Sequence, residues 1–127
     1  MRCIKSKRLT RIVKRSEYLR VKQRGSSVAK PGLVMQAAPS ANDGSYVYPR
    51  VGFTVSKRVG NAVKRNRARR RLKSIASDVL PKEGFQSWDY VFIGRLVTLD
   101  RPYDLLLEDT RAALRKIHQK TIKKRMS

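Results

Sequence analysis

The sequence predicts a single small domain of the α+β class, in which helices and strands share one core. The chain has 127 residues, which is within the roughly 100 to 150 residues that usually form one folding unit. Hydrophobic residues make up 40% of the chain and fall in periodic runs, so a packed core is expected rather than disorder. Some runs have the period of a strand and others that of a helix, which predicts a mixed architecture.

The N-terminal part of the chain predicts a basic arm followed by a short helix. Residues 1–15 are basic, and we expect them to form an extended arm. Ser16 is a good N-cap and Gly25 a good C-terminal stop, so residues 17–24 should be helical. A helix this short must dock on the rest of the domain to persist.

Two strands are predicted in the first half of the chain. Leu33–Ala37 follows a Lys-Pro-Gly breaker, and Tyr46–Ser56 follows a polar loop, with Pro49 as a potential break. In the second strand hydrophobic side chains alternate with small polar ones, so one face can enter a core while the other leaves room for a ligand backbone. An ordinary half-solvated strand shows the same alternation, and the pattern does not decide between the two.

A long helical pattern begins after Asn61, a plausible N-cap. An apolar stripe at helical spacing follows in its C-terminal half, formed by Leu72, Ile75, Ala76, Val79 and Leu80. The N-terminal half instead carries cations in nearly every direction around the helix axis. Like charges three and four residues apart repel each other, so counterions or phosphates should stabilise this half.

Two further elements complete the predicted domain. Asp89–Arg95 is a nearly continuous apolar run, which is typical of a strand inside a sheet. A long helix should start at about Tyr103, and its buried side is expected to be Leu106, Ala113, Leu114 and Ile117. Four acids near this start could form a metal cluster, but stabilisation of the helix dipole is the favoured explanation for Asp100, Asp104, Glu108 and Asp109.

The charge of the chain predicts a polyanionic partner. Lys and Arg number 31 against nine acids, which gives a net charge of +22, and such a chain binds nucleic acid at least non-specifically. Residues 1–77 hold 21 of the basic residues and two of the acids. We therefore expect the N-terminal half to face the nucleic acid.

Other functional classes are disfavoured by what the sequence lacks. One Cys and one His allow no internal disulfide and make a zinc site within the chain improbable, which fits a reducing, cytoplasmic setting. The longest apolar runs fall short of the roughly 18 residues that span a bilayer, so no membrane association is expected. The basic half offers no His and two acids for proton transfer or metal binding, and we expect no catalytic and no metal-binding residues in the protein.

Two adjacent motifs carry a resemblance to a known family. Residues 55–63 read V-S-K-R-V-G-N-A-V and residues 64–70 read K-R-N-R-A-R-R, and a strand from Asp89 to Arg95 follows. In this order and over nearly the whole chain, the sequence resembles the protein subunit of bacterial ribonuclease P. The resemblance implies one compact, ribosomal-protein-like domain over residues 16–127. Its element order would be αβββαβα, with a left-handed βαβ crossover that presents the Arg-Asn-Arg helix beside a cleft.

The resemblance also implies a function. In this family the catalyst is an RNA subunit that removes the 5′ leader of precursor tRNA, and the protein binds the leader and stabilises the ribozyme. The protein would thus be a non-catalytic subunit of an endoribonuclease. Mg²⁺ would be held mainly by RNA phosphates and would act on the attacking water and the leaving oxygen. The partners implied are the catalytic RNA and precursor tRNA, without an obligate protein partner.

Two sets of site residues follow from the matching positions. Contact with the catalytic RNA is expected from Lys57, Arg58, Arg65, Asn66, Arg67, Arg69, Arg70 and Lys73. Arginine suits phosphate oxygens through its planar fork, and an Asn side chain can both donate and accept hydrogen bonds. Contact with the leader is expected from Tyr18, Lys22, Val34, Gln36 and Thr54. A single Lys or Arg could also be a solvated surface group, and a lone Tyr on a short helix is as often simply packed.

The chain departs from the family at two of these positions. Lys22 and Gln36 stand where the family often carries aromatic residues. Base stacking on this surface should therefore be poorer, and phosphate attraction greater.

Two alternatives come from other functional classes. A ribosomal or other structural RNA-binding protein would share the charge, the size and the lack of catalytic groups, and only the ordered motifs argue against it. A DNA-binding protein is disfavoured because the sequence shows no helix-turn-helix pair, zinc-ligand spacing or basic-zipper heptad.

Overall fold

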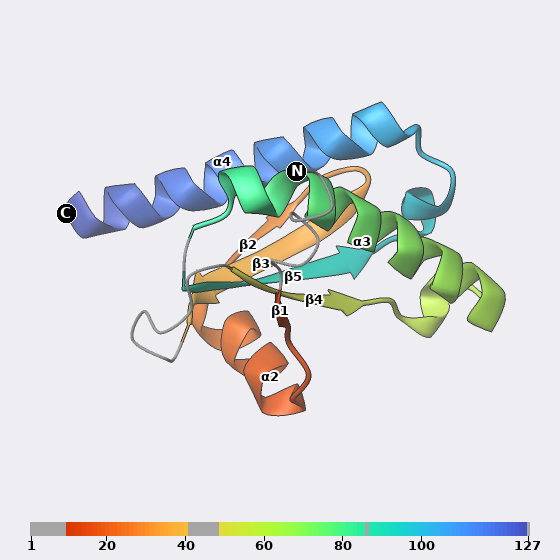
Figure 1. Ribbon diagram of the computed structural model, residues 1–127, viewed down its shortest axis with the longest axis horizontal. Coiled ribbons are helices and arrows are strands. Elements are labelled where there is room, and N and C mark those ends of the chain that lie inside the picture. The colour runs from red at the N-terminus through yellow and green to blue at the C-terminus, as the bar shows by residue number, and fades with distance from the viewer. Residues whose placement is uncertain (1–9, 41–48, 86, 127) are drawn as a thin grey trace.

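The computed structural model of the chain describes residues 10–40, 49–85 and 87–126 (Figure 1). Within them lie five strands, three α-helices and two short 3₁₀ helices. In chain order these are β1 (Thr10–Arg11), α2 (Arg15–Arg24), β2 (Ser26–Ala29), β3 (Leu33–Pro39), β4 (Arg50–Thr54), η1 (Lys57–Val59), α3 (Ala62–Glu83), β5 (Trp88–Gly94), η2 (Leu96–Leu99) and α4 (Tyr103–Met126).

The strands form one mixed sheet in the order β1-β4-β5-β3-β2. Strands β4 and β5 are parallel neighbours, and α3 is the connection between them. Strand β3 pairs antiparallel with β5 and with β2, while β1 pairs parallel with β4 at the edge. This arrangement confirms the predicted α+β class and the βαβ unit around the basic helix.

Helices cover the two faces of the sheet unequally. Helices α3 and α4 lie on one face, and α2 crosses the other (Figure 1). The larger core lies under α3 and α4, where Met35 and Phe92 meet the stripe that begins at Leu72. A smaller cluster lies under α2 and consists of Ile12, Val21, Ala38 and Val91 with Tyr18 and Ile93 against it. Much of the second face therefore stays outside the main core.

The structure confirms the predicted N-cap and the predicted apolar stripe of α3. Asn61 is the N-cap, and its Oδ1 accepts a hydrogen bond from the Lys64 N–H at 3.0 Å. All five residues of the predicted apolar stripe are buried, whereas none of residues 62–67 is. The buried C-terminal half thus anchors a cationic N-terminal half, which extends past the ends of β4 and β5 (Figure 1).

The predicted start of the first helix was wrong. Helix α2 begins at Arg15 with Lys14 as N-cap, and Ser16 lies inside the helix. The reason is that the Lys14 carbonyl accepts from the N–H groups of Glu17 and Tyr18, so the first turn closes two residues earlier without a side-chain cap. The predicted stop at Gly25 is confirmed.

The end of the expected arm belongs to the folded domain. Of residues 1–15 the structure describes 10–15, and there Thr10–Arg11 pairs with β4 while α2 already starts at Arg15. Ile12 is buried and its N–H donates to the Val51 carbonyl at 2.8 Å. Pairing at the open edge of β4 thus orders a segment that reads as an arm in the sequence.

Strand boundaries also differ from the expectation. The residue pattern did not predict strand β2 (Ser26–Ala29), because only Val28 among its four side chains is buried, which leaves little periodic signal. Strand β4 begins at Arg50, after Pro49, and the earlier part of the predicted strand, within residues 41–48, lies outside the described residues. Among the described residues no helix is long and apolar enough to cross a membrane.

A buried ion network fastens α2 to the sheet. The Arg50 guanidinium donates from Nε and a terminal nitrogen to the two Asp89 carboxylate oxygens at 2.8 and 2.7 Å. Its other terminal nitrogen lies 2.6 Å from the Glu17 carboxylate of α2. Arg20, one turn further along α2, donates to the Pro39 carbonyl at 2.7 Å. The Asp89 hydrogen bond raises the pKa of Arg50, so this guanidinium stays charged in its buried position.

We predict that Asp89→Asn lowers the free energy of unfolding by roughly 3 to 5 kcal/mol, because it leaves the Arg50 charge buried without its main partner. Urea denaturation followed by circular dichroism would measure the change. Asp104→Asn is the matched control, since it alters the net charge equally at an exposed position. Similar losses in both variants would mean that the network contributes nothing beyond net charge.

Candidate nucleic-acid interface

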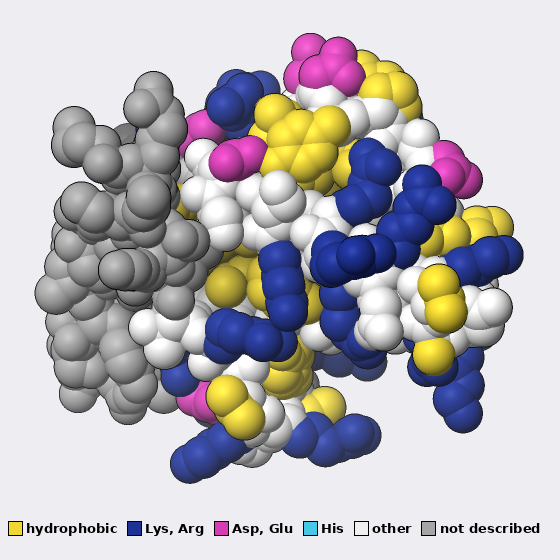
Figure 2. Space-filling model, turned by 45° about the vertical axis from the view of Figure 1, so that its right-hand side comes forward, with side chains coloured by type: hydrophobic (Ala, Val, Ile, Leu, Met, Phe, Trp, Pro, Cys, Tyr) yellow, Lys and Arg dark blue, Asp and Glu magenta, His cyan; other side chains and the backbone are white. Residues whose placement is uncertain are grey.

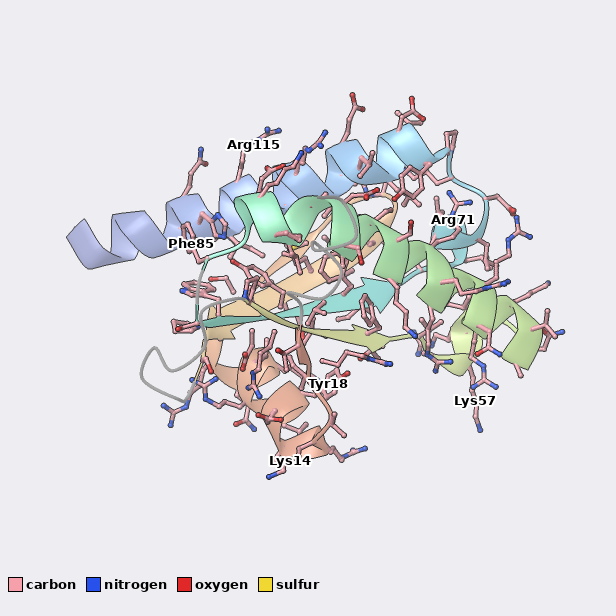
Figure 3. The ribbon with its side chains drawn as sticks, in the orientation of Figure 1. Lys14, Tyr18, Lys57, Arg71, Phe85 and Arg115 are labelled. Carbon is pink, nitrogen blue, oxygen red and sulfur yellow. The ribbon has the colours of Figure 1, made fainter. Side chains whose placement is uncertain are left out.

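The cationic half of α3 forms one of two candidate surfaces. Lys and Arg side chains crowd over this side of the molecule, while acidic side chains gather mainly toward its upper margin (Figure 2). Asn66, Arg67, Arg70 and Lys73 are exposed, and Arg65 and Arg69 are half-buried. Lys57 and Arg58 are exposed on η1, where Lys57 points away from the sheet (Figure 3).

These side chains have few acidic partners. In the part of the chain that the structure describes, Arg67 alone of the predicted set has a carboxylate within 4 Å, the Asp100 Oδ1 at 3.4 Å. Arg69 donates instead to the Asn66 side-chain oxygen at 3.2 Å. The Arg65 Nε is buried without a hydrogen-bond partner. The surface is therefore a concentration of largely uncompensated positive charge.

The predicted residues do not lie on one continuous face. Arg70 is at the centre of the exposed side of α3 and lines two separate grooves. One groove of about 470 Å³ is lined by Val63, Asn66, Arg69, Arg70 and Lys73. On the other side of Arg70, Arg67 faces a second groove toward η2 and the start of α4. The Arg-Asn-Arg motif is thus divided between two sides of the helix.

Local geometry positions η1 before α3. Gly60 has φ of +143°, a conformation that side-chain-bearing residues rarely adopt, and its Cβ position would also meet Lys64. The preceding Ser56 Oγ accepts from the Arg58 N–H at 3.3 Å. The turn at Gly60 therefore lets Lys57 and Arg58 join the cations of α3 at one end of the domain.

The second candidate surface is the sheet face under α2. Strand register places Val34 and Thr54 on either side of Ile93, on the face opposite the main core. Gln36 lies two residues along β3 on the same face, beside Val91. The predicted parity of Val34, Gln36 and Thr54 is consistent with this register.

A groove of about 370 Å³ joins α2 to this face and brings Tyr18 and Thr54 together. The sequence analysis missed its other lining residues, Val13, Arg15 and Leu19. Val13 is 83% exposed and Leu19 43%, which is unusual for aliphatic side chains so close together. The signal that could have identified Val13 and Leu19 is their apolar character among the charged residues around the start of α2. Lys22 does not line this groove and is exposed one turn after Tyr18.

Tyr18 is held in place by the edge of the sheet. Its hydroxyl donates to the Ile12 carbonyl and accepts from the Phe53 N–H, both at 3.2 Å. The hydroxyl thereby satisfies the β4 amide that follows the last backbone pairing with β1. A Cβ at Gly52 would lie 2.6 Å from the Tyr18 ring, so the ring rests directly on the glycine backbone. Tyr18 is therefore a rigid wall of the groove, and its role in base stacking stays a prediction.

Three of the groups that could perform acid–base or metal chemistry already have partners within the protein. Asp109 accepts from the Gly32 N–H at 2.9 Å and pairs with Arg101, while Asp100 pairs with Arg67. His118 Nε2 lies 2.9 Å from the Tyr90 hydroxyl, and burial lowers its pKa. Among the described residues no three metal-ligating side chains of His, Cys, Asp or Glu form a group.

Comparison with known proteins gives a consistent family. The sequence matches the family described as Ribonuclease P over residues 6–118. It is 52% identical over 111 residues to the ribonuclease P protein component of Paramagnetospirillum magneticum, covering 87% of this chain and 84% of that protein. The corresponding protein of Ruegeria pomeroyi is 50% identical over 106 residues, which are 83% of each chain.

Solved structures agree with the fold. The Staphylococcus aureus RNase P protein superposes with a TM-score of 0.67 at 26% identity, covering 83% of this chain and 92% of that one. The Thermotoga maritima RNase P protein superposes with a TM-score of 0.68 over 84% and 96% of the two chains. At 23% identity the second likeness concerns the fold alone.

We predict that Gly52→Ala displaces Tyr18 from the sheet edge, because the new methyl group would occupy the space of the ring. The Phe53 amide, which donates to the Tyr18 hydroxyl, should then exchange with solvent several-fold faster in hydrogen-exchange NMR. Gly94→Ala is the control, since its methyl group would meet Val55 and Leu72 on the other face. Unchanged exchange of the Phe53 amide in Gly52→Ala would show that Tyr18 does not depend on the bare glycine.

Proposed function

The chain belongs to the ribonuclease P protein family, and from this membership we propose how its two surfaces divide their RNA partners. It is a protein subunit of ribonuclease P, and its partner is the ribonuclease P RNA. In the proposal the cationic half of α3, with η1, binds this catalytic RNA. The sheet face under α2 binds the 5′ leader of precursor tRNA.

The observation that carries the first assignment is the uncompensated charge on α3. Six of the seven predicted cations have no acid within 4 Å in the described chain. Such a cluster gains free energy on binding RNA, because its cations release the counterions condensed on the phosphates. Exposed Asn66 adds a side chain that can donate and accept at a sugar or base edge.

The second assignment is supported by the shape and chemistry of the α2 face. The groove at Tyr18 is lined mostly by apolar side chains and by one cation, Arg15. It opens onto a sheet face that ends in the small polar side chain of Thr54. A single RNA strand needs an apolar or aromatic wall for its bases and a nearby cation for its backbone.

Cleavage itself is proposed to remain with the RNA, with Mg²⁺ held mainly by RNA phosphates. Two buried carboxylates are already bound within the protein, Asp89 to Arg50 and Asp109 to the Gly32 N–H. The protein then contributes binding and orientation rather than a proton carrier. We place this activity in the cytoplasm, because a reducing compartment suits a chain with one cysteine. The alternative of a ribosomal or other structural RNA-binding protein is not favoured, since the family match spans residues 6–118.

Reconstitution with the catalytic RNA and precursor tRNA at low Mg²⁺ tests the proposal. Cleavage should rise sharply when the protein is added, and Arg70→Ala should weaken binding of the catalytic RNA. Loss of one phosphate contact should also reduce the slope of log affinity against log salt by about one. The affinity for a free leader oligonucleotide should change much less. Equal losses for both RNAs would contradict the division into two surfaces.

We predict that Lys22→Phe strengthens leader binding and flattens its salt dependence. The change replaces a phosphate-attracting cation by a stacking ring one turn after Tyr18 on α2. Fluorescence titration of precursor tRNA with long and short leaders, at low and high salt, would measure it. Lys116→Phe is the control, because Lys116 is also an exposed lysine but lies on α4. If leader affinity is unchanged at both salt concentrations, Lys22 does not line the surface that holds the leader.

A further inference from the structure

The groove between α3 and the start of α4 differs in its lining residues from the groove at Asn66 and Lys73. It has a volume of about 460 Å³ and runs between α3 and the segment from η2 to the start of α4. It is lined by Arg67, Arg70, Arg71, Ser74, Asp100, Arg101, Pro102 and Tyr103. Four arginines and one aromatic ring therefore line one depression, and four of the eight residues come from outside α3.

Two of the arginines build the walls. Arg71 donates through its terminal nitrogens to the carbonyls of Leu99 and Arg101, which ties the chain after η2 to α3 (Figure 3). Arg101 in turn lies 2.7 Å from the Asp109 carboxylate. Asp109 also accepts from the Gly32 N–H, so this pair is anchored to the turn before β3. The two sides of the groove are thus cross-linked before any ligand arrives.

Tyr103 forms a fixed aromatic surface in this groove. Its side of α4 faces α3, and its hydroxyl lies 2.5 Å from the Asp78 carboxylate and 3.0 Å from the Ser74 hydroxyl. The residue nevertheless remains 36% exposed. A ring that is held at its hydroxyl while its body stays accessible loses little freedom when a base stacks on it.

The charges that remain available in the groove are those of Arg67 and Arg70. They are three residues apart, which makes them neighbours on the surface of α3. Asp100 is the one acid lining the groove, and its side chain is 84% exposed at 3.4 Å from Arg67. Asp78 and Asp109 lie behind Tyr103 and Arg101 and neutralise part of the wall. An exposed pair such as Arg67–Asp100 is weak, so a phosphate can replace Asp100 beside Arg67.

We propose that this groove is a second RNA-binding site, separate from the face formed by Asn66, Arg69 and Lys73. A phosphodiester of the catalytic RNA lies between Arg67 and Arg70, and an adjacent unpaired base stacks on Tyr103. Asp100 competes with the phosphate for Arg67 and so weakens RNA binding in this groove. The inference rests on the proposed function, because it takes α3 as the surface that binds the catalytic RNA.

Two variants with the same net charge test whether Asp100 competes with the phosphate for Arg67. Asp100→Asn should raise the affinity for the catalytic RNA roughly threefold at low salt, because an exposed ion pair no longer opposes the phosphate. Asp104→Asn raises the net charge equally but lies in the first turn of α4, outside the groove lining, and should give a clearly smaller gain. Equal gains in filter binding would overturn the role of Asp100.

The stacking surface is tested at Tyr103. Tyr103→Leu should reduce affinity for the catalytic RNA roughly tenfold, the scale of one lost base–aromatic contact. Tyr103→Phe keeps the ring but loses its anchor to Asp78 and Ser74, and should lose less. Thermal midpoints of both variants show whether the fold is kept. A folded Tyr103→Leu with wild-type RNA affinity would overturn the site.

The affinities of Arg70→Ala and Lys73→Ala for catalytic RNA show whether a failure concerns this inference alone or also the proposed function. If Arg70→Ala and Lys73→Ala both leave the affinity for catalytic RNA unchanged, α3 is not the RNA-binding surface and both ideas fail. Suppose instead that those two variants lose affinity, while Tyr103→Leu keeps wild-type affinity and Asp100→Asn gains no more than Asp104→Asn. Then only the second groove is overturned. Losses at Lys73 and Tyr103 that add in the double variant support two independent contacts.

Discussion

The structure depends on the contrast between the two halves of one helix, α3: one half is cationic and exposed, and the other is apolar and buried. The N-terminal half of α3 gathers cations that repel one another, and none of residues 62–67 is buried. Its C-terminal half buries an apolar stripe from Leu72 to Leu80 against the sheet. Because the helix is continuous, burial at one end holds the repelling charges at the other, past the ends of β4 and β5. A surface built this way is stable in the folded chain but favours an anionic partner.

A second constraint keeps the two faces of the sheet distinct. Strand β5 lies between β3 and β4, so alternate side chains of one strand serve the core under α3 and the face under α2. The buried pair of Arg50 and Asp89 sits on the α2 side and reaches Glu17, which fixes where this helix crosses. Tyr18 then closes the edge of β4. One small domain can in this way present a cationic helix and a groove lined mostly by apolar side chains without either surface disturbing the other.

Residue patterns within single helices and strands were enough to predict much of the fold. The features that were not predicted depend on contacts between residues far apart in the sequence. The Asn61 cap, the stripe of α3 and the parity of Val34 depend on spacing within one element, which a sequence displays directly. The contact of Arg50 with Asp89 joins residues 39 positions apart and has no local pattern. Strand Thr10–Arg11 is likewise ordered by the edge it meets rather than by its own residues. The division of the cations between two grooves required the position of η2 and α4 beside α3, which no spacing in the motif encodes.

The central claim is that the cationic half of α3 is held by its own buried end and is completed by RNA. Amide hydrogen exchange along α3, measured at low ionic strength with and without the catalytic RNA, tests it most directly. We expect slow exchange at residues 72–80 in both states, and fast exchange at residues 62–70 that becomes slow when RNA binds. Equally slow exchange along the whole helix in the free protein, unchanged by RNA, would contradict it.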